Sequence, residues 1–163
     1  MVALSLLASC QTAKRYVMPT DSMEPTIRKG ERFTVDPNAY KERAPMRGDV
    51  VVLVDPSGGE LVVKRVIGVE GDKLEGKGLD VLRNGERLTE TYIEHKGRHP
   101  AALDNFGPVS VARATVFVMG DNRDFSFDSR TPQFGLVKLD AIRGKALAIA
   151  GSDEPSRIGK AIQ

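Results

Sequence analysis

Cysteine and histidine are scarce in this sequence. Its single cysteine, Cys10, excludes a framework of internal disulfide bonds. The two histidines, His95 and His99, fall in the polar stretch HKGRHP, where no cysteine or second histidine pair completes a metal site. We therefore expect a solvated loop at these histidines and predict no metal or other cofactor.

An excess of charge of one sign is also missing. The 163 residues carry 24 Lys and Arg against 22 Asp and Glu, a net charge of +2. A nucleic-acid-binding domain would group basic residues on one stretch, so nucleic acid is not an expected partner. With 40% hydrophobic and 28% charged residues, the composition is that of an ordinary globular chain, and a chain of this length can bury a core without disulfides or metals.

Long apolar runs are absent too. The opening stretch MVALSLLASC is apolar over only about eight positions, far short of the roughly 20 residues that a membrane-spanning helix needs. It also lacks the basic first part of a secretory signal. Three interpretations of residues 1–15 stay open: the truncated end of a membrane anchor, a lipobox LASC that would lipidate Cys10, and an apolar strand or frayed terminus. Membrane attachment of some kind is favoured.

Short β-branched runs between glycine turns make up most of the remaining sequence. Strands are predicted in RFTVD, GDVVVLVD, LVVKRVIGVEG, LDVLRNGERLTE, VSVARATVFVMG and ALAIAG. The Asn-Gly pair of RNGE (83–86) tolerates the positive φ of a type I′ turn and predicts a hairpin. The one helix candidate is the short SMEPTI (22–27), which Ser22 could cap. The predicted fold class is therefore mainly β.

The length predicts about one domain. Residues 16–150 are expected to form the β domain, and the more polar segment at about 71–114 is expected to be a small insert in it. The last residues, 151–163, are predicted to form a loose C-terminal tail.

Two residues are candidates for chemistry. Ser22 could be a cap or turn hydroxyl, or a nucleophile activated by a base elsewhere in the chain. Lys64 lies in LVVKRVIGV, which reads as a strand buried on both faces. Burial disfavours the charged form of a lysine and lowers its pKa, and a neutral lysine is a competent general base. Arg65 points to the opposite face and stays charged.

A third region, VMGDNRDFSFDSRTPQFG (118–135), joins an apolar strand to a loop dense in Asp, Asn, Arg and Ser. This density predicts an ordered, hydrogen-bonded loop. Asp128 and Arg130 are placed to form an ion pair that pins it, and Ser126 could aim its hydroxyl at a neighbouring lysine.

With these blocks in order, the sequence resembles the type I signal peptidases, which are membrane-bound serine proteases that remove signal peptides from exported proteins. The blocks are MPTDSMEPTIRKGERFTVD, RGDVVVL, VVKRVIGVEGDKL and MGDNRDFSFDSR, followed by FG, and they span residues 18–135. The resemblance implies a coiled antiparallel β-sheet core with a small polar insert subdomain. It departs from the family pattern at Phe125, a position that is often Asn, and at the bulky Phe127.

The resemblance also implies the roles of individual residues. Ser22 would be the nucleophile and Lys64 the general base. The backbone N–H of Ser22 and the hydroxyl of Thr20, where the family usually has serine, would form the oxyanion hole. Met23 would lie in the substrate cleft. The remaining residues of the implied site are the lysine-orienting Ser126 and the structural ion pair Asp128 and Arg130.

The implied reaction is acyl transfer on secretory precursors, with cleavage after small residues of the Ala-x-Ala type. The implied partners are precursors with signal peptides and the membrane surface. The implied location is the outer face of the bacterial cytoplasmic membrane.

Several alternatives stay open. A specialised conjugation-type maturation peptidase would use the same clan chemistry. Self-cleaving repressors share a Ser/Lys dyad and DSMEP and VKR blocks, but they lack the GDNRDFSFDSR loop and usually carry a helix-turn-helix, for which the 21 residues before Ser22 are too few. A catalytically silent β-rich binding module is the non-enzyme alternative.

Overall fold

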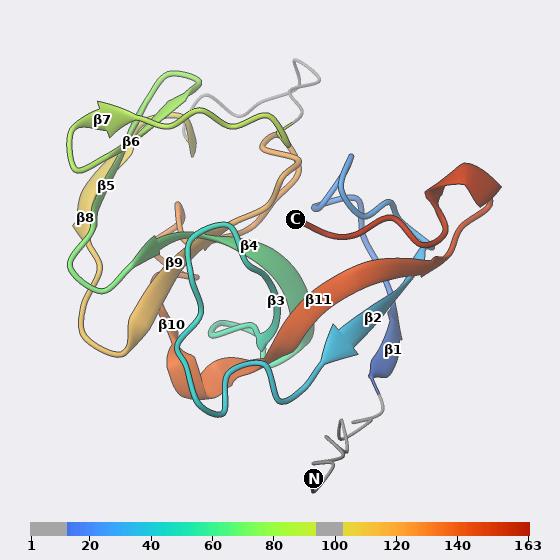
Figure 1. Cartoon of the computed structure of the whole chain (residues 1–163). Coiled ribbons are helices and arrows are strands. Elements are labelled where there is room, and N and C mark those ends of the chain that lie inside the picture. The colour runs from blue at the N-terminus through green and yellow to red at the C-terminus, as the bar shows by residue number, and fades with distance from the viewer. Residues whose placement is uncertain (1–12, 94–102) are drawn as a thin grey trace, which may run out of the picture.

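The computed structural model describes residues 13–93 and 103–163. Most of the N-terminal apolar segment, including Cys10, and both histidines lie outside the described residues. Figure 1 shows two β-sheets joined by β4 and β9, with the tail of the chain returning to the middle of the molecule.

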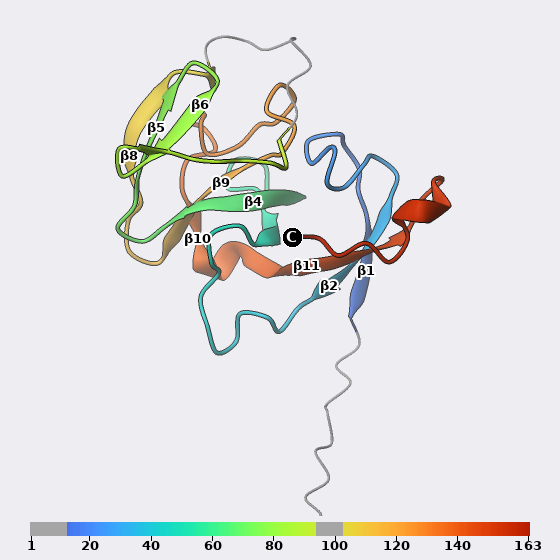
Figure 2. The ribbon, with the colours of Figure 1, turned by 45° about the horizontal axis from the view of Figure 1, so that its top comes forward.

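The main sheet has seven antiparallel strands. In spatial order they are β1 (Lys14–Val17), β2 (Arg32–Asp36), β11 (Ile142–Gly151), β3 (Val50–Val54), β4 (Leu61–Val69), β9 (Thr115–Met119) and β10 (Val137–Lys138). Register shifts interrupt the pairing of β11 with both of its neighbours and of β4 with β9. Because such bulges bend strands and increase their twist, the sheet coils, as Figure 2 shows.

A smaller antiparallel sheet contains β7 (Glu86–Arg87), β6 (Asp80–Arg83), β5 (Lys73–Lys77) and β8 (Phe106–Ser110). All four strands come from the polar segment that the sequence analysis singled out as an insert. Asn84 and Gly85 join β6 to β7 with φ angles of 56° and 86°, so the hairpin prediction is confirmed. Two 3-10 turns, η2 (Leu139–Ala141) and η3 (Pro155–Arg157), flank β11.

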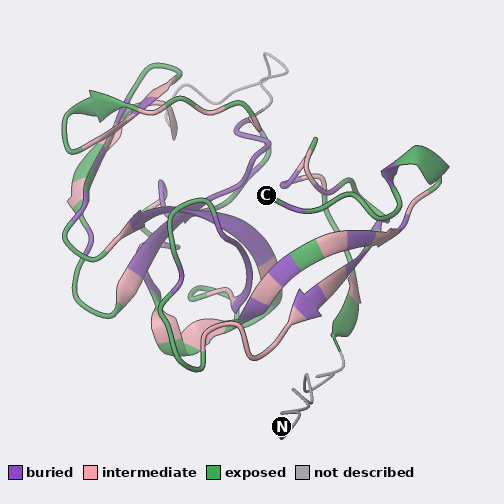
Figure 3. Cartoon of the chain, viewed as in Figure 1, coloured by how far each residue is buried: buried purple, intermediate pink, exposed green. Residues whose placement is uncertain are grey.

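The core consists of three apolar clusters, and the alternation of strand side chains explains how they are separated. In β3, Val50 and Val52 pack into one cluster, while Val51 and Leu53 pack into a second cluster on the other face of the sheet. A third cluster joins the two sheets, with Phe117 of β9 packing among residues of the small sheet. Figure 3 shows the resulting burial along β3 and β4 and the exposed hairpins of the small sheet.

The prediction of a loose tail at 151–163 is wrong. Arg157 and Ile162 are buried, and the tail doubles back along β11, where the N–H of Ile149 donates to Lys160 and the N–H of Ile162 donates to Leu147. The cause is burial, because Ile162 joins the apolar cluster formed by β2, β3 and β11. The mostly polar composition of residues 151–163 gave no sign in the sequence that Ile162 would pack into the core.

Candidate active site

The segment from Thr20 to Ile27, here called the nucleophile turn, connects β1 to β2. Its own hydrogen bonds run from the N–H of Glu24 to the Asp21 carbonyl and from the N–H of Ile27 to the Met23 carbonyl. The helix expected at 22–27 does not form, so that prediction is wrong. Pro25 has no N–H to donate to the Asp21 carbonyl. The carbonyl of Ser22 accepts instead from the backbone N–H of Asn122.

Ser22 and Lys64 meet although they are 42 positions apart in the chain. The Nζ of Lys64 donates to the Oγ of Ser22 at 3.0 Å, and the two residues are only 4% and 5% exposed. Strand β4 carries Lys64 into the interior, next to β3. Loss of hydration lowers the pKa of the Lys64 amine below its ordinary value of 10.5, while the nearby Asp128 carboxylate opposes this effect. The site therefore favours a neutral amine in contact with a serine hydroxyl.

Thr20 is also in contact with the serine. Its Oγ1 donates to the Oγ of Ser22 at 3.1 Å and accepts from the backbone N–H of Ser22 at 3.4 Å. The threonine hydroxyl and the Ser22 N–H are thus adjacent hydrogen-bond donors beside the Ser22 hydroxyl.

The loop between β9 and β10 contains residues 120–130, here called the catalytic loop after the role that the resemblance implies for Ser126, and this segment holds the nucleophile turn from one side. The N–H of Asn122 donates to the Ser22 carbonyl at 3.1 Å, and its Nδ2 donates to the Asp21 carbonyl at 3.1 Å. The prediction of an ordered loop is confirmed, because every residue from Gly120 to Arg130 is buried except Phe125 and Phe127. Sequence reasoning had given Asn122 no role, although it lies within the block that carried the resemblance.

Asp128 and Arg130 form a buried ion pair within this loop, with the Nε of Arg130 donating to Oδ1 of Asp128 at 2.9 Å. The N–H of Gly120 donates to Oδ2 of Asp128, and Nη2 of Arg130 donates to the carbonyls of Arg123 and Ser126. Burial alone would raise the pKa of Asp128, but the Arg130 guanidinium holds it below its ordinary value. The pair therefore stays charged and ties the loop to the end of β9.

Ser126 is buried at the same place; its Oγ makes no hydrogen bond of normal geometry among the described residues, but it lies close enough to Asp128 to help lower the pKa of that carboxyl group. A Cβ on Gly120 would collide with the Ser126 side chain and with the Ser22 carbonyl oxygen. The bare backbone of Gly120 thus brings Ser126 close to the nucleophile turn, although no bond from Ser126 to Lys64 is formed.

Met23 does not line an open cleft in this structure. It is fully buried in the apolar cluster that includes Ile27 and Phe33. The Met23 side chain therefore anchors the nucleophile turn to the hydrophobic core.

The other face of β4 carries a second polar cluster, as strand alternation requires. Arg65 makes a two-pronged ion pair with Asp121, with distances of 2.8 and 2.6 Å, and its guanidinium lies 3.9 Å from the centre of the Tyr92 ring. Arg123 makes a similar two-pronged pair with Glu90. Sequence reasoning missed these partners, because Glu90 and Tyr92 come from the segment that follows β7 within the polar insert.

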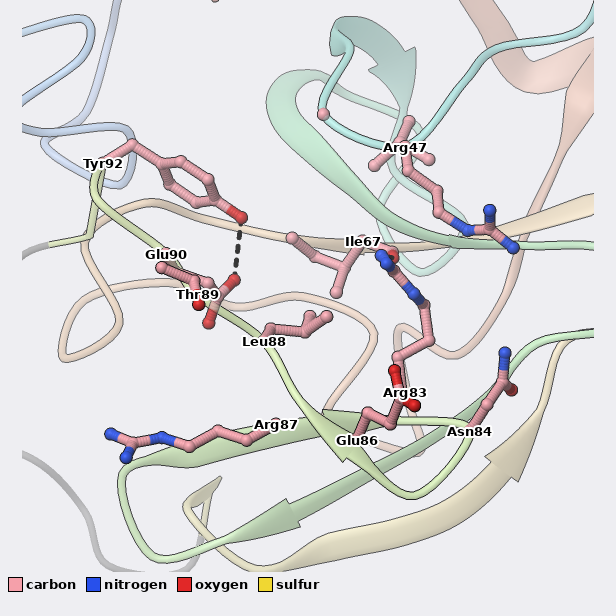
Figure 4. A pocket seen from close by; sticks show the side chains of 12 residues that line it. Arg47, Ile67, Arg83, Asn84, Glu86, Arg87, Leu88, Thr89, Glu90 and Tyr92 are labelled. Atoms are coloured by element: carbon pink, nitrogen blue, oxygen red, sulfur yellow. Dashed lines mark hydrogen bonds between the residues drawn. The ribbon is translucent and has the colours of Figure 1, made fainter.

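A polar cavity of about 400 Å³ opens on this second face, between the two sheets (Figure 4). Arg47, Arg83, Glu90 and Tyr92 are among the residues that line it, and neither Ser22 nor Lys64 is. The cavity is therefore separate from the serine–lysine contact. Within residues 13–93 and 103–163, no three His, Cys, Asp or Glu side chains gather closely enough to hold a metal ion.

Comparisons with known proteins agree with one another. Residues 1–150 match the family described as "Signal peptidase, peptidase S26". Signal peptidase I of Bacillus licheniformis is 33% identical over 148 residues, which cover 88% of this chain and 79% of that protein. Signal peptidase IB of Staphylococcus aureus (strain Mu50) is 36% identical over 143 residues, covering 80% of this chain and 73% of that protein.

A solved structure is similar as well. The crystal structure of a signal peptidase I from Enterococcus faecalis V583 superposes with a TM-score of 0.52 at 30% identity, covering 63% of this chain and 97% of the other. The fold and the matches define a serine endopeptidase of the signal peptidase type. The chain belongs to the peptidase S26 family of signal peptidases. The predicted family and the predicted mainly β antiparallel fold are confirmed.

Proposed function

We propose that this signal peptidase works through a Ser22–Lys64 dyad and cleaves precursors after small residues in an Ala-x-Ala arrangement. One observation carries the proposal: a lysine amine buried in the interior lies 3.0 Å from a serine oxygen. A serine hydroxyl is a poor nucleophile at neutral pH and needs an adjacent base. Among the described residues, the groups that hydrogen-bond to the Ser22 Oγ are Lys64 and Thr20, and of these two only the amine can act as a base.

The reaction begins when neutral Lys64 accepts the proton of Ser22 and the serine oxygen attacks the carbonyl carbon of the scissile bond. The tetrahedral intermediate collapses, the C–N bond breaks, and Lys64 returns the proton to the leaving amine. Water, deprotonated by the same amine, then attacks the acyl-enzyme; the bond between the acyl carbon and the Ser22 oxygen breaks, Lys64 returns the proton to that oxygen, and the signal peptide leaves with a free carboxyl group. Acylation and deacylation each begin with an uncharged amine, which the lowered pKa of Lys64 favours.

Charge on the oxyanion requires donors that are already in place. The N–H of Ser22 donates to the Thr20 Oγ1 at 3.4 Å, and the Thr20 hydroxyl donates to the Ser22 Oγ at 3.1 Å, so both donors lie beside the reacting oxygen and would exchange these contacts for a substrate oxygen. Removal of one such donor typically costs about 10²–10³ in rate. Thr20 keeps the donor of a serine and adds a methyl group.

Ser126, Asp128 and Arg130 support the lysine in this proposal. The buried ion pair holds the loop that places Ser126 beside Gly120. The Ser126 hydroxyl lies near Asp128 without a hydrogen bond of normal geometry among the described residues, and a rotation of this hydroxyl would let it orient the amine when substrate enters.

Membrane-inserted precursors are the proposed substrates, and the outer face of the cytoplasmic membrane is the proposed location. Membership of the signal peptidase family supports this. So does the exposure of Phe125 and Phe127 on either side of Ser126, because exposed apolar side chains such as phenylalanine can insert at the boundary between lipid headgroups and acyl chains. Across the described part of the chain, no helix has the length and apolarity to span a bilayer.

Incubation with a secretory precursor that carries Ala-x-Ala before its cleavage site tests the dyad. The wild type is expected to release the mature protein, and Ser22→Ala and Lys64→Met are expected to release none. Replacement of the last Ala by a large residue should also stop cleavage. Turnover that survives either substitution in the enzyme would remove the dyad, and unchanged cleavage of the large-residue precursor would remove the specificity.

A further inference from the structure

The tail 151–163 lies outside the residues that match the family, 1–150, yet it makes contact with the nucleophile turn. Figures 1 and 2 show η3 and the residues around it returning beside the segment between β1 and β2. The closest link is Arg157 of η3, which is buried.

Arg157 makes four hydrogen bonds, two to Glu31 and two to the nucleophile turn. Its Nε and Nη2 donate to the two carboxylate oxygens of Glu31 at 2.6 and 2.9 Å. The same Nη2 donates to the carbonyls of Pro25 and Thr26 at 3.1 Å each. These two carbonyls lie only three and four residues after Ser22, so one guanidinium fixes the far end of the turn that carries the nucleophile.

Apolar contacts also connect the tail to the nucleophile turn. Ile162 of the tail belongs to the same buried cluster as Met23 and Ile27, which are the residue after the nucleophile and the end of its turn. The carbonyl of Gln163 accepts from Nη1 of Arg65 at 2.7 Å, and Arg65 also holds Asp121 of the catalytic loop.

The nucleophile turn is thus clamped from two sides. Asn122 of the catalytic loop holds the carbonyls of Asp21 and Ser22, and Arg157 of the tail holds those of Pro25 and Thr26. The position of a serine oxygen relative to its base is decisive, because displacement by about 1 Å can cost on the order of 10²-fold in rate.

We propose that the tail 151–163 is a positioning element for the reaction and that Arg157 is its positioning residue. Arg157 acts through the nucleophile turn and does not touch substrate. A planar guanidinium can serve a carboxylate and two carbonyls at once, whereas a lysine ammonium keeps the charge but loses this geometry. The inference rests on the proposed dyad, because it concerns the distance between Ser22 and Lys64.

The test compares Arg157→Met and Arg157→Lys with the wild type on the Ala-x-Ala precursor, with kcat and KM measured well below the melting temperature of each variant. Arg157→Met is expected to lower kcat about 10- to 100-fold and to change KM less than about threefold. Arg157→Lys should recover part of kcat, since it retains the ion pair with Glu31.

Two controls separate positioning from loss of stability. Glu154→Gln breaks the exposed ion pair between Arg28 and Glu154 in the same tail and should leave both constants unchanged. Val81→Ala opens a cavity in the small sheet, where Val81 is buried, and reports what a lowered melting temperature alone does to kcat.

Wild-type kcat in folded Arg157→Met would overturn the inference, as would an equal loss of kcat in Val81→Ala at a similar melting temperature. A higher KM with kcat unchanged would overturn it as well. If Arg157→Met does not fold, Arg157→Lys decides: a lower kcat at constant KM supports the inference, and wild-type kcat refutes it. Failure of the dyad is recognised separately, because Ser22→Ala would then cleave as the wild type does, or the wild type would not cleave, and both proposals would fall together.

Discussion

Replacement of Lys64 by Met should abolish turnover and make the protein more stable. Lys64 is 4% exposed, and its amine donates a hydrogen bond to Ser22. An ammonium group at this position has lost most of its hydration, so the folded protein carries a cost whenever Lys64 is protonated. Methionine has a similar length and no polar atom, and it fills irregular space readily.

The size of the effect follows from the chemistry of burial. Replacing buried charged groups by apolar side chains of similar volume is often neutral or stabilising by about 1–4 kcal/mol. We expect a gain of about 1–3 kcal/mol near pH 7, which corresponds to a melting temperature roughly 2–10 °C higher for a domain of this size. Loss of the general base should lower kcat by about 10²–10⁴-fold or more.

The pH dependence of stability independently tests whether Lys64→Met is more stable than the wild type. The pKa of Lys64 is lowered in the folded state, so between that pKa and 10.5 the unfolded chain binds the proton that the folded chain has released. The stability of the wild type therefore rises with pH across this window. The advantage of Lys64→Met should be largest at the acidic end of the window and should shrink as the pH approaches 10.5.

Urea denaturation of the wild type, Lys64→Met and Ser22→Ala at several pH values measures these differences. Ser22→Ala is the matched control, since it also removes activity but leaves the amine buried with one partner fewer, and it should not gain stability. Two results would refute the claim that burial destabilises the charged form of Lys64: a Lys64→Met variant less stable than the wild type at pH 7, or a stability gain of that variant that grows toward pH 10.5.

Three further outcomes are expected from the rest of the structure. Arg65→Met leaves Asp121 buried without its two-pronged partner and should lower the free energy of unfolding by about 3–5 kcal/mol, as urea denaturation would show; a loss below about 1 kcal/mol would contradict this. Burial would raise the pKa of Asp72, but Arg47 lowers it from 3.8 to about 2, so the wild type should exceed Asp72→Asn in stability by about 2 kcal/mol above pH 4. That margin should disappear as the pH falls toward 2, and a margin independent of pH would contradict the pairing. Gly85→Ala places a side chain at a φ of 86° and should cost about 1 kcal/mol in thermal unfolding while cleavage stays unchanged.

Local chemistry explains which parts of the fold the sequence could predict. The hairpin at Asn84 and Gly85 depends on positive φ angles at two residues, which few other residue types accept, so the four residues RNGE were enough to predict it. Strands such as β3 depend on valine runs. The nucleophile turn shows the limit of this reasoning, because a serine, an acidic residue and a proline at 22–27 are typical of a helix start, while the carbonyl of Ser22 is taken by Asn122. A partner 100 positions away cannot be read from local propensity.

The candidate site divides in the same way. Burial of Lys64 followed from the apolar neighbours in its own strand, and an ion pair between Asp128 and Arg130 followed from their spacing. The contact between Lys64 and Ser22 could be inferred only through resemblance to a family, because 42 intervening residues determine it. Glu90 and Arg157 were missed for the same reason, since each meets its partner through tertiary packing and neither lies in a recognisable block.

The arrangement of charge around Lys64 shows why a neutral amine can exist beside so many ionised groups. Asp128 alone would stabilise the ammonium form and raise the pKa of Lys64, but the adjacent Arg130 opposes it. Across the strand, Asp121 would act in the same direction as Asp128, and it is neutralised by Arg65. Two of the three carboxylates that raise the pKa of Lys64, Asp128 and Asp121, are thus paired with a guanidinium that cannot lose its proton. The third, Asp55, accepts hydrogen bonds from Ser57 and Gly58 instead. Desolvation remains the largest influence on the pKa of Lys64, and the two arginines hold their loops in place without donating a proton to the amine.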